Sequence, residues 1–490
     1  MSKVILALDL GTTGNRVIAF NKSGEIRAQA YYEFPQIFPS PGWVEHDPIE
    51  IWNTLMKSLN EVISKTGIEN IESIGITNQR ETTILWETAT GKPVYNAIVW
   101  QCRRTADICQ KLKDYTFLFK EKTGLPLDPY FSGTKIKWIL DNIDGVRKSA
   151  EVGKILFGTV DSWILWKLTG GKVHATDPSN ASRTLCYNIK ENKFDNELLK
   201  ILNIPENIFP AVQQSGSKFG VTDKSVVGRE IPITGVLGDQ QASLFAHSGL
   251  EQGIVKNTYG TGLFVMSSTG SELIPEKNLV NTIAWQFENE LNYAIEGSIF
   301  IGGAAVQWLR DELNLIKSAS ETEAIAESLE SNEGVYFVPA LSGLGAPYWD
   351  PSARGMIIGI TRGTKKEHFI RAALESVAYQ TRDVIEEIKS TANLKVKKLS
   401  VDGGLTQNHF LMQFQADILG IPVELPQIQE MTAFGAAGMA GINSGFWSKE
   451  EFQSLKKIKQ IFNPVMERET SDKLYSNWKR AVSKSLNWEE

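Results

Sequence analysis

Apolar runs broken by glycine-rich turns are the first pattern in the chain. Residues 4–10 (VILALDL) are apolar except for Asp9 and predict a strand that ends at the turn GTTGN, residues 11–15. Two further strands are predicted over 16–20 (RVIAF) and 25–34 (EIRAQAYYEF), with the turn NKSG between them. The pattern predicts a three-stranded meander whose first tight turn carries an aspartate and two threonines.

The second half of the chain opens with the same pattern. GIVKNTY at 253–259 predicts a strand, GTG at 260–262 a turn and LFVMSS at 263–268 a second strand, and later strands are predicted near 281–287 and 291–297. Glycines let backbone N–H groups approach phosphate oxygens, and threonine hydroxyls add further donors. A single turn of this kind is also typical of an ordinary β-hairpin. Because two halves of similar length repeat it, we predict a duplicated architecture that clamps ATP.

Helices are predicted between the strands, which indicates an α/β protein. The segment 47–63 has an aspartate cap, a proline at the first helical position and a glutamate three residues after the cap. The segment 364–388 has Thr364 and Glu367 at the spacing of a capping box, followed by apolar residues at helical intervals.

A third loop has the form of an anion site. Residues 401–419 (VDGGLTQNHFLMQFQADIL) predict a strand, a turn at Gly403 and Gly404, and an amphipathic helix whose N-terminal amides could face a phosphate. Asn408 is predicted one turn into this helix, within reach of a nucleotide. Glycines there are equally expected for tight strand–helix packing. The P-loop motif is absent, and GLG at 343–345 does not continue as a dinucleotide-binding motif.

Bulk composition narrows the class of protein. A length of 490 residues favours two large domains, and a formal charge of −6 argues against general affinity for nucleic acid or anionic membrane. Three cysteines without C-x-x-C spacing predict reduced thiols and a cytoplasmic location. No run approaches the roughly 20 apolar residues that span a bilayer, so membrane insertion is not expected. The five histidines are scattered, and nothing resembles a zinc or iron site.

Two pairs of polar residues follow predicted strands. Arg80 and Glu81 come just after the strand 71–77, and Asp239 and Gln240 lie between a short apolar strand and an alanine-rich helix start. Adjacent polar side chains at strand ends normally face a cleft, where these four could grip a polyhydroxylated molecule and remove a proton from it. The alternatives are a surface ion pair for the first two and a helix cap for the aspartate.

Long motifs then identify a family resemblance. They are PGWVEHDP (41–48), GITNQRETT (75–83), NAIVWQCRRTA (96–106), DPYFSGTKIKWILDN (128–142), GDQQASLF (238–245), NTYGTG (257–262), GLGAPYWDP (343–351) and DGGLTQNHFLMQFQ (402–415). With these motifs the chain resembles the FGGY carbohydrate kinases, and among them the branch that phosphorylates glycerol. The resemblance implies an α/β fold of two ribonuclease H-like (actin-like ATPase) domains, residues 1–248 and 249–490, with an active-site cleft between them.

The resemblance also implies site residues, cofactors and partners. The implied glycerol site consists of Arg80, Glu81, Trp100, Tyr130, Asp239, Gln240 and Phe264. The implied nucleotide contacts are Thr12, Thr13, Gly14, Arg16, Thr261, Gly303, Gln307, Gly404 and Asn408. The expected cofactors are ATP and Mg²⁺, with Asp9 helping to hold the metal and Asp239 acting as general base in forming sn-glycerol 3-phosphate. The resemblance further implies a homodimer or homotetramer.

Some residues depart from the family pattern. Gly14 stands where serine is frequent, Leu10 where glutamine is frequent and His409 where a second asparagine is frequent, which concerns the nucleotide contacts and not the reaction. The segment 218–235 is shorter than the loop that binds fructose 1,6-bisphosphate in enterobacterial relatives, and it lacks the histidine phosphorylated in Gram-positive relatives. Neither regulation is therefore predicted. The alternatives to this branch of the family are an FGGY kinase of another small polyol or ketose and an ATP-driven chaperone or filament protein.

Overall fold

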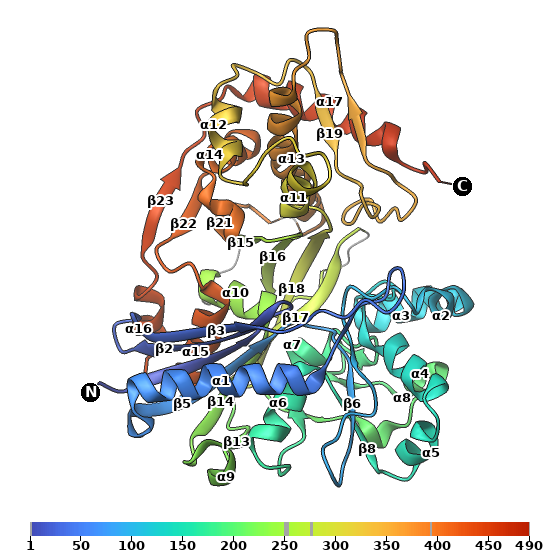
Figure 1. Cartoon of the computed structure of the whole chain (residues 1–490), viewed down its shortest axis with the longest axis vertical. Coiled ribbons are helices and arrows are strands. Elements are labelled where there is room, and N and C mark those ends of the chain that lie inside the picture. The colour runs from blue at the N-terminus through green and yellow to red at the C-terminus, as the bar shows by residue number, and fades with distance from the viewer. Residues whose placement is uncertain (1, 249–253, 275–277, 393, 490) are drawn as a thin grey trace.

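Two β-sheets organise the protein in a computed structural model, which describes residues 2–248, 254–274, 278–392 and 394–489. The first sheet has, in order, β13 (Gly220–Val221), β14 (Pro232–Gly238), β5 (Ile71–Asn78), β1 (Val4–Leu10), β2 (Gly14–Asn21) and β3 (Ile26–Glu33). The second has, in order, β17 (Val280–Phe287), β18 (Glu290–Ile299), β16 (Leu263–Gly270), β15 (Val255–Tyr259), β21 (Leu399–Asp402), β22 (Val423–Pro426) and β23 (Ile458–Phe462). We call the two halves built on these sheets the first lobe and the second lobe; they are stacked along the long axis in Figure 1.

The same strand plan occurs in both sheets. An antiparallel hairpin, β1–β2 in the first and β15–β16 in the second, is followed by a further antiparallel strand, β3 or β18. The second sheet has one more antiparallel strand, β17, beyond β18. On the other side two parallel strands follow, β5 and β14 or β21 and β22. The glycine–threonine turns predicted from the sequence join the two strands of each hairpin. The predicted fold class, two α/β domains with a repeated hairpin, is confirmed.

Helices surround the sheets, and short strand pairs connect them. The first lobe contains α1 (Pro48–Thr66), α2 (Ala106–Lys111), α3 (Thr116–Thr123), α4 (Ser132–Asn142), α5 (Val146–Glu151), α6 (Val160–Leu168), α7 (Pro178–Ala181), α8 (Asn196–Leu202), α9 (Lys224–Val227) and α10 (Asp239–Ser248). Later helices are α11 (Gly303–Asp311), α12 (Glu321–Glu327), α13 (Lys366–Ala392), α14 (His409–Leu419), α15 (Met431–Asn443), α16 (Lys449–Ser454) and α17 (Arg468–Ser485). The strand pairs are β4 (Glu45–His46) with β7 (Ala97–Ile98), β6 (Ile84–Glu87) with β8 (Ile155–Gly158), β9 (Ala175–Thr176) with β12 (Ala211–Val212), β10 (Tyr187–Asn188) with β11 (Lys193–Phe194), and β19 (Tyr336–Val338) with β20 (Met356–Ile358).

The two predicted helix starts have different outcomes. Asp47 caps α1 by accepting the N–H of Ile49 at 2.8 Å, which confirms the first. The predicted capping box of α13 is wrong, because the hydroxyl of Thr364 instead accepts the N–H of Thr361 at 2.9 Å in a turn before the helix. The helix begins at Lys366. The backbone N–H of Lys365, just before the helix, donates to the ring nitrogen Nδ1 of His368.

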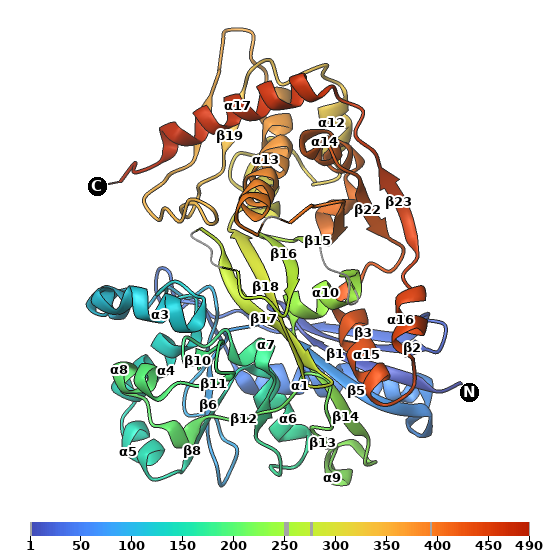
Figure 2. The same cartoon turned by 180° about the vertical axis from the view of Figure 1, so that it is seen from behind.

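Helix α15 belongs to the second half of the chain but packs on the first sheet. It lies against β1, β5, β14 and α10, and both views show it among the strands of the first lobe (Figures 1 and 2). Glycines permit this approach: a Cβ on Gly75 would lie 2.2 Å from the carbonyl oxygen of Ala436, and one on Gly435 would lie 1.9 Å from that of Ala242. The core on this face of the sheet is therefore completed by a late segment of the chain.

Other sequence expectations can also be compared with the structure. All three cysteines are free and buried. In the described ranges, no helix is both long and apolar enough to cross a membrane. The predicted boundary between residues 248 and 249 adjoins 249–253, which lie outside the described residues.

Candidate active site

One cavity of about 290 Å³ collects polar residues from both lobes. It is lined by Thr12, Thr13, Gln36, Arg80, Glu81, Trp100, Gln101, Tyr130, Asp239, Gln240, Thr258, Gly260, Thr261, Gly262 and Phe264. All seven residues expected to hold the substrate are among them, together with three of those expected to contact the nucleotide. The structure thus brings the two groups of side chains to one place.

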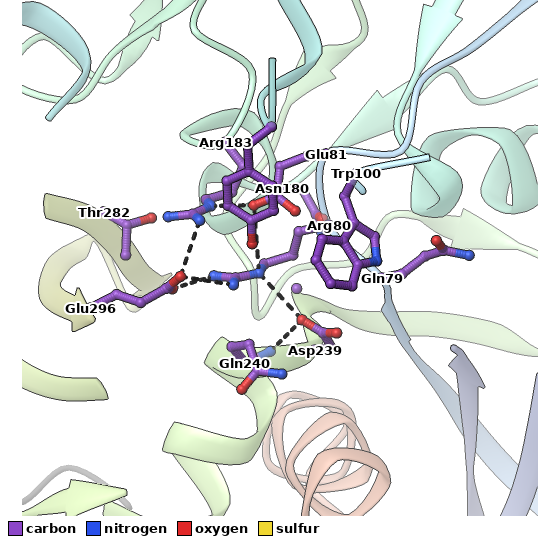
Figure 3. A network of polar contacts seen from close by, with 12 residues as sticks. Gln79, Arg80, Glu81, Trp100, Asn180, Arg183, Asp239, Gln240, Thr282 and Glu296 are labelled. Carbon is purple, nitrogen blue, oxygen red and sulfur yellow. Dashed lines mark hydrogen bonds and ion pairs between the residues drawn. The ribbon is translucent and has the colours of Figure 1, made fainter. Parts of the chain in front are cut away.

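Arg80 is held by carboxylates from two sides. It follows the end of β5, and its side chain is only 2% exposed. Its two terminal nitrogens donate to the two oxygens of Glu296 on β18, at 2.6 and 3.0 Å, while its Nε lies 3.3 Å from Oδ1 of Asp239 (Figure 3). Burial disfavours the charged form, but these carboxylates keep the pKa of Arg80 above its ordinary value. The guanidinium therefore stays charged and fixed in orientation.

Glu81 presents one free oxygen to the cavity. Its backbone is left-handed, with φ of 60°, a conformation that is uncommon for a residue with a side chain and frequent at functional sites. Its Oε1 accepts the Nε–H of Arg183 at 2.6 Å. Among the described residues none donates to Oε2, so this atom can accept a hydrogen bond from a bound hydroxyl.

Asp239 lies where β14 ends and α10 begins. Its Oδ1 accepts the N–H of Gln240 at 2.7 Å, whereas a capping carboxylate accepts N–H groups two or three residues further on. No described residue donates to Oδ2. Burial raises the pKa of Asp239 to about 6, with Arg80 opposing and Glu81 adding to the shift. Such a carboxylate is ionised at neutral pH and has a pKa suited to a general base.

Gln240 is oriented by a buried lysine. Lys256 on β15 donates to Oε1 of Gln240 and, at 3.0 Å, to the hydroxyl of Thr258. Burial lowers the pKa of Lys256 to about 8. Because the amide oxygen is engaged, Gln240 offers its NH₂ group to the cavity.

Three aromatic rings form one wall of the cavity. The ring of Trp100 lies 5.7 Å from that of Tyr130 and 6.1 Å from that of Phe264, both edge-on. The indole N–H of Trp100 donates to the hydroxyl of Thr12 at 2.9 Å, which links this wall to the first glycine–threonine turn. Burial raises the pKa of Tyr130 far above its ordinary value, so its hydroxyl remains protonated. The same three rings also line a larger cavity of about 540 Å³.

The second glycine–threonine turn is tied to the start of α11. The N–H groups of Gly303 and Ala304 donate to the carbonyl oxygens of Gly260 and Thr261, at 2.9 and 3.1 Å. Gln307 lies one turn into α11 and is exposed. Neither Gly303 nor Gln307 lines the cavity, although Gly303 is hydrogen-bonded to Gly260, which does.

Three more of the expected nucleotide residues also do not line the cavity. Gly14 is the first residue of β2, where an added Cβ would meet the carbonyl oxygen of Tyr32 at 2.6 Å. Arg16 forms an ion pair with Glu430 and does not line the cavity. Gly404 is exposed, with nothing near an added Cβ.

Asn408 is the N-terminal cap of α14. It therefore precedes the helix instead of lying one turn inside it as expected. Its Oδ1 accepts the N–H of Leu411 at 2.9 Å, and its Nδ2 donates to Thr322 at 3.1 Å.

Asp9 is the residue expected to help hold Mg²⁺. Burial raises its pKa to about 7; Arg16 opposes this shift, and Glu430 and Asp239 add to it. No described side chain donates a hydrogen bond to its carboxylate, and the described part of the chain holds no group of three or more acidic, histidine or cysteine residues placed to bind a metal. Mg²⁺ at kinase sites keeps several waters and binds one or two carboxylates plus phosphate oxygens, so this carboxylate fits such an ion.

Two residues of the site were not predicted from the sequence. Arg183 and Glu296 are fully buried behind Arg80 and Glu81 and connect them. Glu296 could have been noticed, since it is the one charged residue in the apolar strand YAIEGSI. Nothing in the local sequence marks Arg183.

Comparison with known proteins gives matches over the whole chain. Residues 4–246 match the N-terminal domain of the FGGY family of carbohydrate kinases, and 255–444 match its C-terminal domain. A glycerol kinase of Aquifex aeolicus is 60% identical over 487 residues, with 99% of each chain covered. The solved structure of Plasmodium falciparum glycerol kinase with ADP has a TM-score of 0.93 at 35% identity and covers 99% of this chain and 98% of its own. A gluconate kinase from Lactobacillus acidophilus, 22% identical with a TM-score of 0.88 and 99% of each chain covered, shares the fold.

Proposed function

The chain belongs to the FGGY family of carbohydrate kinases, and from this we propose that it transfers the γ-phosphoryl group of ATP to a terminal hydroxyl of glycerol, giving sn-glycerol 3-phosphate. One observation carries the proposal: the polar grip of Arg80, Glu81 and Asp239 shares a cavity with both glycine–threonine turns. The full-length similarity to glycerol kinases supports the same substrate.

Selectivity for glycerol follows from how its hydroxyls would be satisfied. Glu81 and Asp239 each offer one carboxylate oxygen that no described residue uses, and Gln240 offers its NH₂ group. A site built to pair each hydroxyl rejects analogues that lack one, because its own buried groups are then left unpaired. The rings of Trp100 and Phe264 cover the carbon chain and exclude water.

Asp239 is proposed as the general base. Its Oδ2 accepts the proton of the attacking hydroxyl as the new O–P bond forms, while the bond from the γ-phosphorus to the bridging oxygen breaks and ADP leaves. The N–H groups of the two turns and the hydroxyls of Thr12, Thr13 and Thr261 position the phosphates. Asp9 is proposed to hold Mg²⁺, which when bound neutralises phosphate charge.

The proposal is tested by following ADP release with glycerol, dihydroxyacetone, xylulose and ribulose. We expect the highest kcat/KM with glycerol and a product that a dehydrogenase specific for sn-glycerol 3-phosphate oxidises. Faster turnover on either ketopentose, or ADP release that does not depend on glycerol, would overturn it. The proposal includes a homodimer or homotetramer in the cytoplasm, which sedimentation and cell fractionation test.

A further inference from the structure

Arg183 and Glu296 form a buried charged pair directly behind the substrate side chains. The side chains of both are 0% exposed, and neither lines the cavity. Arg183 follows α7 in the first lobe, whereas Glu296 is on β18 of the second sheet. Figure 3 shows Glu296 on the opposite side of Arg80 from Asp239.

Glu296 fixes which edge of Arg80 faces the cavity. Its two oxygens accept from the two terminal nitrogens of Arg80, a bidentate pairing that sets the plane of the guanidinium. The Nε edge is then the one that points toward the cavity. The Nε atom lies 3.3 Å from Oδ1 of Asp239 and 3.8 Å from Oε1 of Glu81.

Arg183 holds one oxygen of Glu81 through a single hydrogen bond and links Glu81 to Glu296. Its Nε–H donates to Oε1 of Glu81 at 2.6 Å, and its Nη2 donates to Oε1 of Glu296 at 3.1 Å. The network therefore contains two positive and two negative side chains. This balance matters because a buried charge is costly unless it is paired.

The network determines what the cavity offers to a ligand. Because one oxygen of Glu81 and one of Asp239 are already engaged, their Oε2 and Oδ2 remain free on either side of the Nε edge of Arg80. Two acceptors that flank a donor match adjacent hydroxyl groups, each of which can donate and accept.

We propose that Arg183 and Glu296 are positioning residues that set the selectivity of this site for adjacent hydroxyl groups. They act through Arg80 and Glu81 and do not touch the substrate. This inference rests on the proposed function, since it concerns how glycerol is distinguished from an analogue that lacks one hydroxyl.

The test compares the full-length protein with two variants of the pair and a matched control. Glu296→Gln keeps the shape but turns an NH₂ group toward Arg80, and Arg183→Lys keeps the charge but loses the planar fork. The control is Glu375→Gln. Glu375 is a buried glutamate that accepts a hydrogen bond of 2.8 Å from Arg371, and it does not line the cavity. ADP release gives kcat and KM for glycerol, for ATP and for propane-1,3-diol, which lacks the central hydroxyl and so has no adjacent pair, and melting temperature reports folding.

We expect both variants of the pair to raise the KM for glycerol by roughly 10-fold to 100-fold, a loss that misplacement by about 1 Å can cause. The KM for ATP should stay within about threefold, and the ratio of kcat/KM for glycerol to that for propane-1,3-diol should fall by about 10-fold. The control should lower the melting temperature and leave these kinetic values unchanged.

If Arg183 and Glu296 only stabilised the fold, their variants would change the melting temperature and not the kinetics. Lower melting temperatures with an unchanged glycerol KM and an unchanged substrate ratio would overturn the inference. If Glu296→Gln does not fold, Arg183→Lys and Ser298→Ala decide; the latter removes one hydrogen bond of 3.0 Å to Glu296. A parent protein inactive on glycerol would instead overturn the proposed function.

Discussion

Glu296 of the second lobe accepts hydrogen bonds from both terminal nitrogens of Arg80 of the first lobe, at 2.6 and 3.0 Å. The two residues are 216 positions apart in the sequence. The polar grip is therefore assembled from both halves of the chain, and neither half presents it alone.

Asp239→Asn is expected to lower kcat with glycerol by about 10² to 10⁴, the usual contribution of a positioned general base. The glycerol KM should change much less, because Arg80 and Glu81 remain. Asp383→Asn is the matched control: the pKa of Asp383 is likewise raised to about 6 by burial, but this residue accepts from Tyr475 and Trp478 in the second lobe. It should affect stability and not kcat. Steady-state kinetics of the folded variants decide, and a kcat within threefold of the parent would remove Asp239 from the mechanism.

The pH dependence follows from the same carboxyl group. Burial raises the pKa of Asp239 to about 6, so kcat/KM for glycerol should increase as pH rises through about 6 and the base loses its proton. The contribution of this carboxyl group to the free energy of unfolding should instead decrease as pH rises. Between about pH 4, the ordinary pKa of aspartate, and about pH 6, the folded protein binds more protons than the unfolded chain, so this group's contribution to stability is lost as pH rises. Denaturant titrations from pH 4 to 7 measure this loss, which should be absent in Asp239→Asn.

Asn408 can be tested for two roles separately. Asn408→Ala removes the cap of α14 and should cost about 1 kcal/mol of unfolding free energy. Asn408→Asp keeps a good capping group but places a negative charge at the expected nucleotide site. We expect its unfolding free energy to stay within about 0.5 kcal/mol of the parent while its KM for ATP rises at least about fivefold, an effect of about 1 kcal/mol. An unchanged KM for ATP would limit Asn408 to capping.

Trp100 and Thr12 should be coupled energetically. Their hydrogen bond of 2.9 Å joins the aromatic wall to the first phosphate turn. Trp100→Phe and Thr12→Val should each lower kcat/KM for glycerol. The double variant should lose about 1 kcal/mol less than the sum, roughly fivefold in rate, because the second change has no hydrogen bond left to break. Strictly additive effects would mean that the two residues act independently.

Local patterns predicted the hairpins, the cap at Asp47 and the positions of the polar pairs at strand ends, because each depends on a few neighbouring residues. They failed at Thr364, where a turn with Thr361 takes the hydroxyl before the helix starts. They also misplaced Asn408, since a short 3-10 helix over Gly404–Gln407 delays the start of α14.

Long-range pairing explains what could not be predicted. Arg183 and Glu296 are 113 positions apart, and only the arrangement of the two sheets brings them together. A charged residue in an apolar strand indicates that a partner exists, but the sequence does not say which one.

The packing of α15 on the first sheet has a consequence for the order in which the protein can mature on the ribosome. Ile5, Ala7 and Phe20 share a core with Phe434 of α15 and Phe452 of α16. The part of this face that α15 and α16 cover therefore stays exposed until some 200 further residues beyond residue 246 have been made, about 10 to 40 s at ordinary rates of synthesis. During that interval the nascent chain presents an apolar surface for trigger factors and other holding chaperones, and a truncated gene that encodes only the first half is expected to yield an aggregating product.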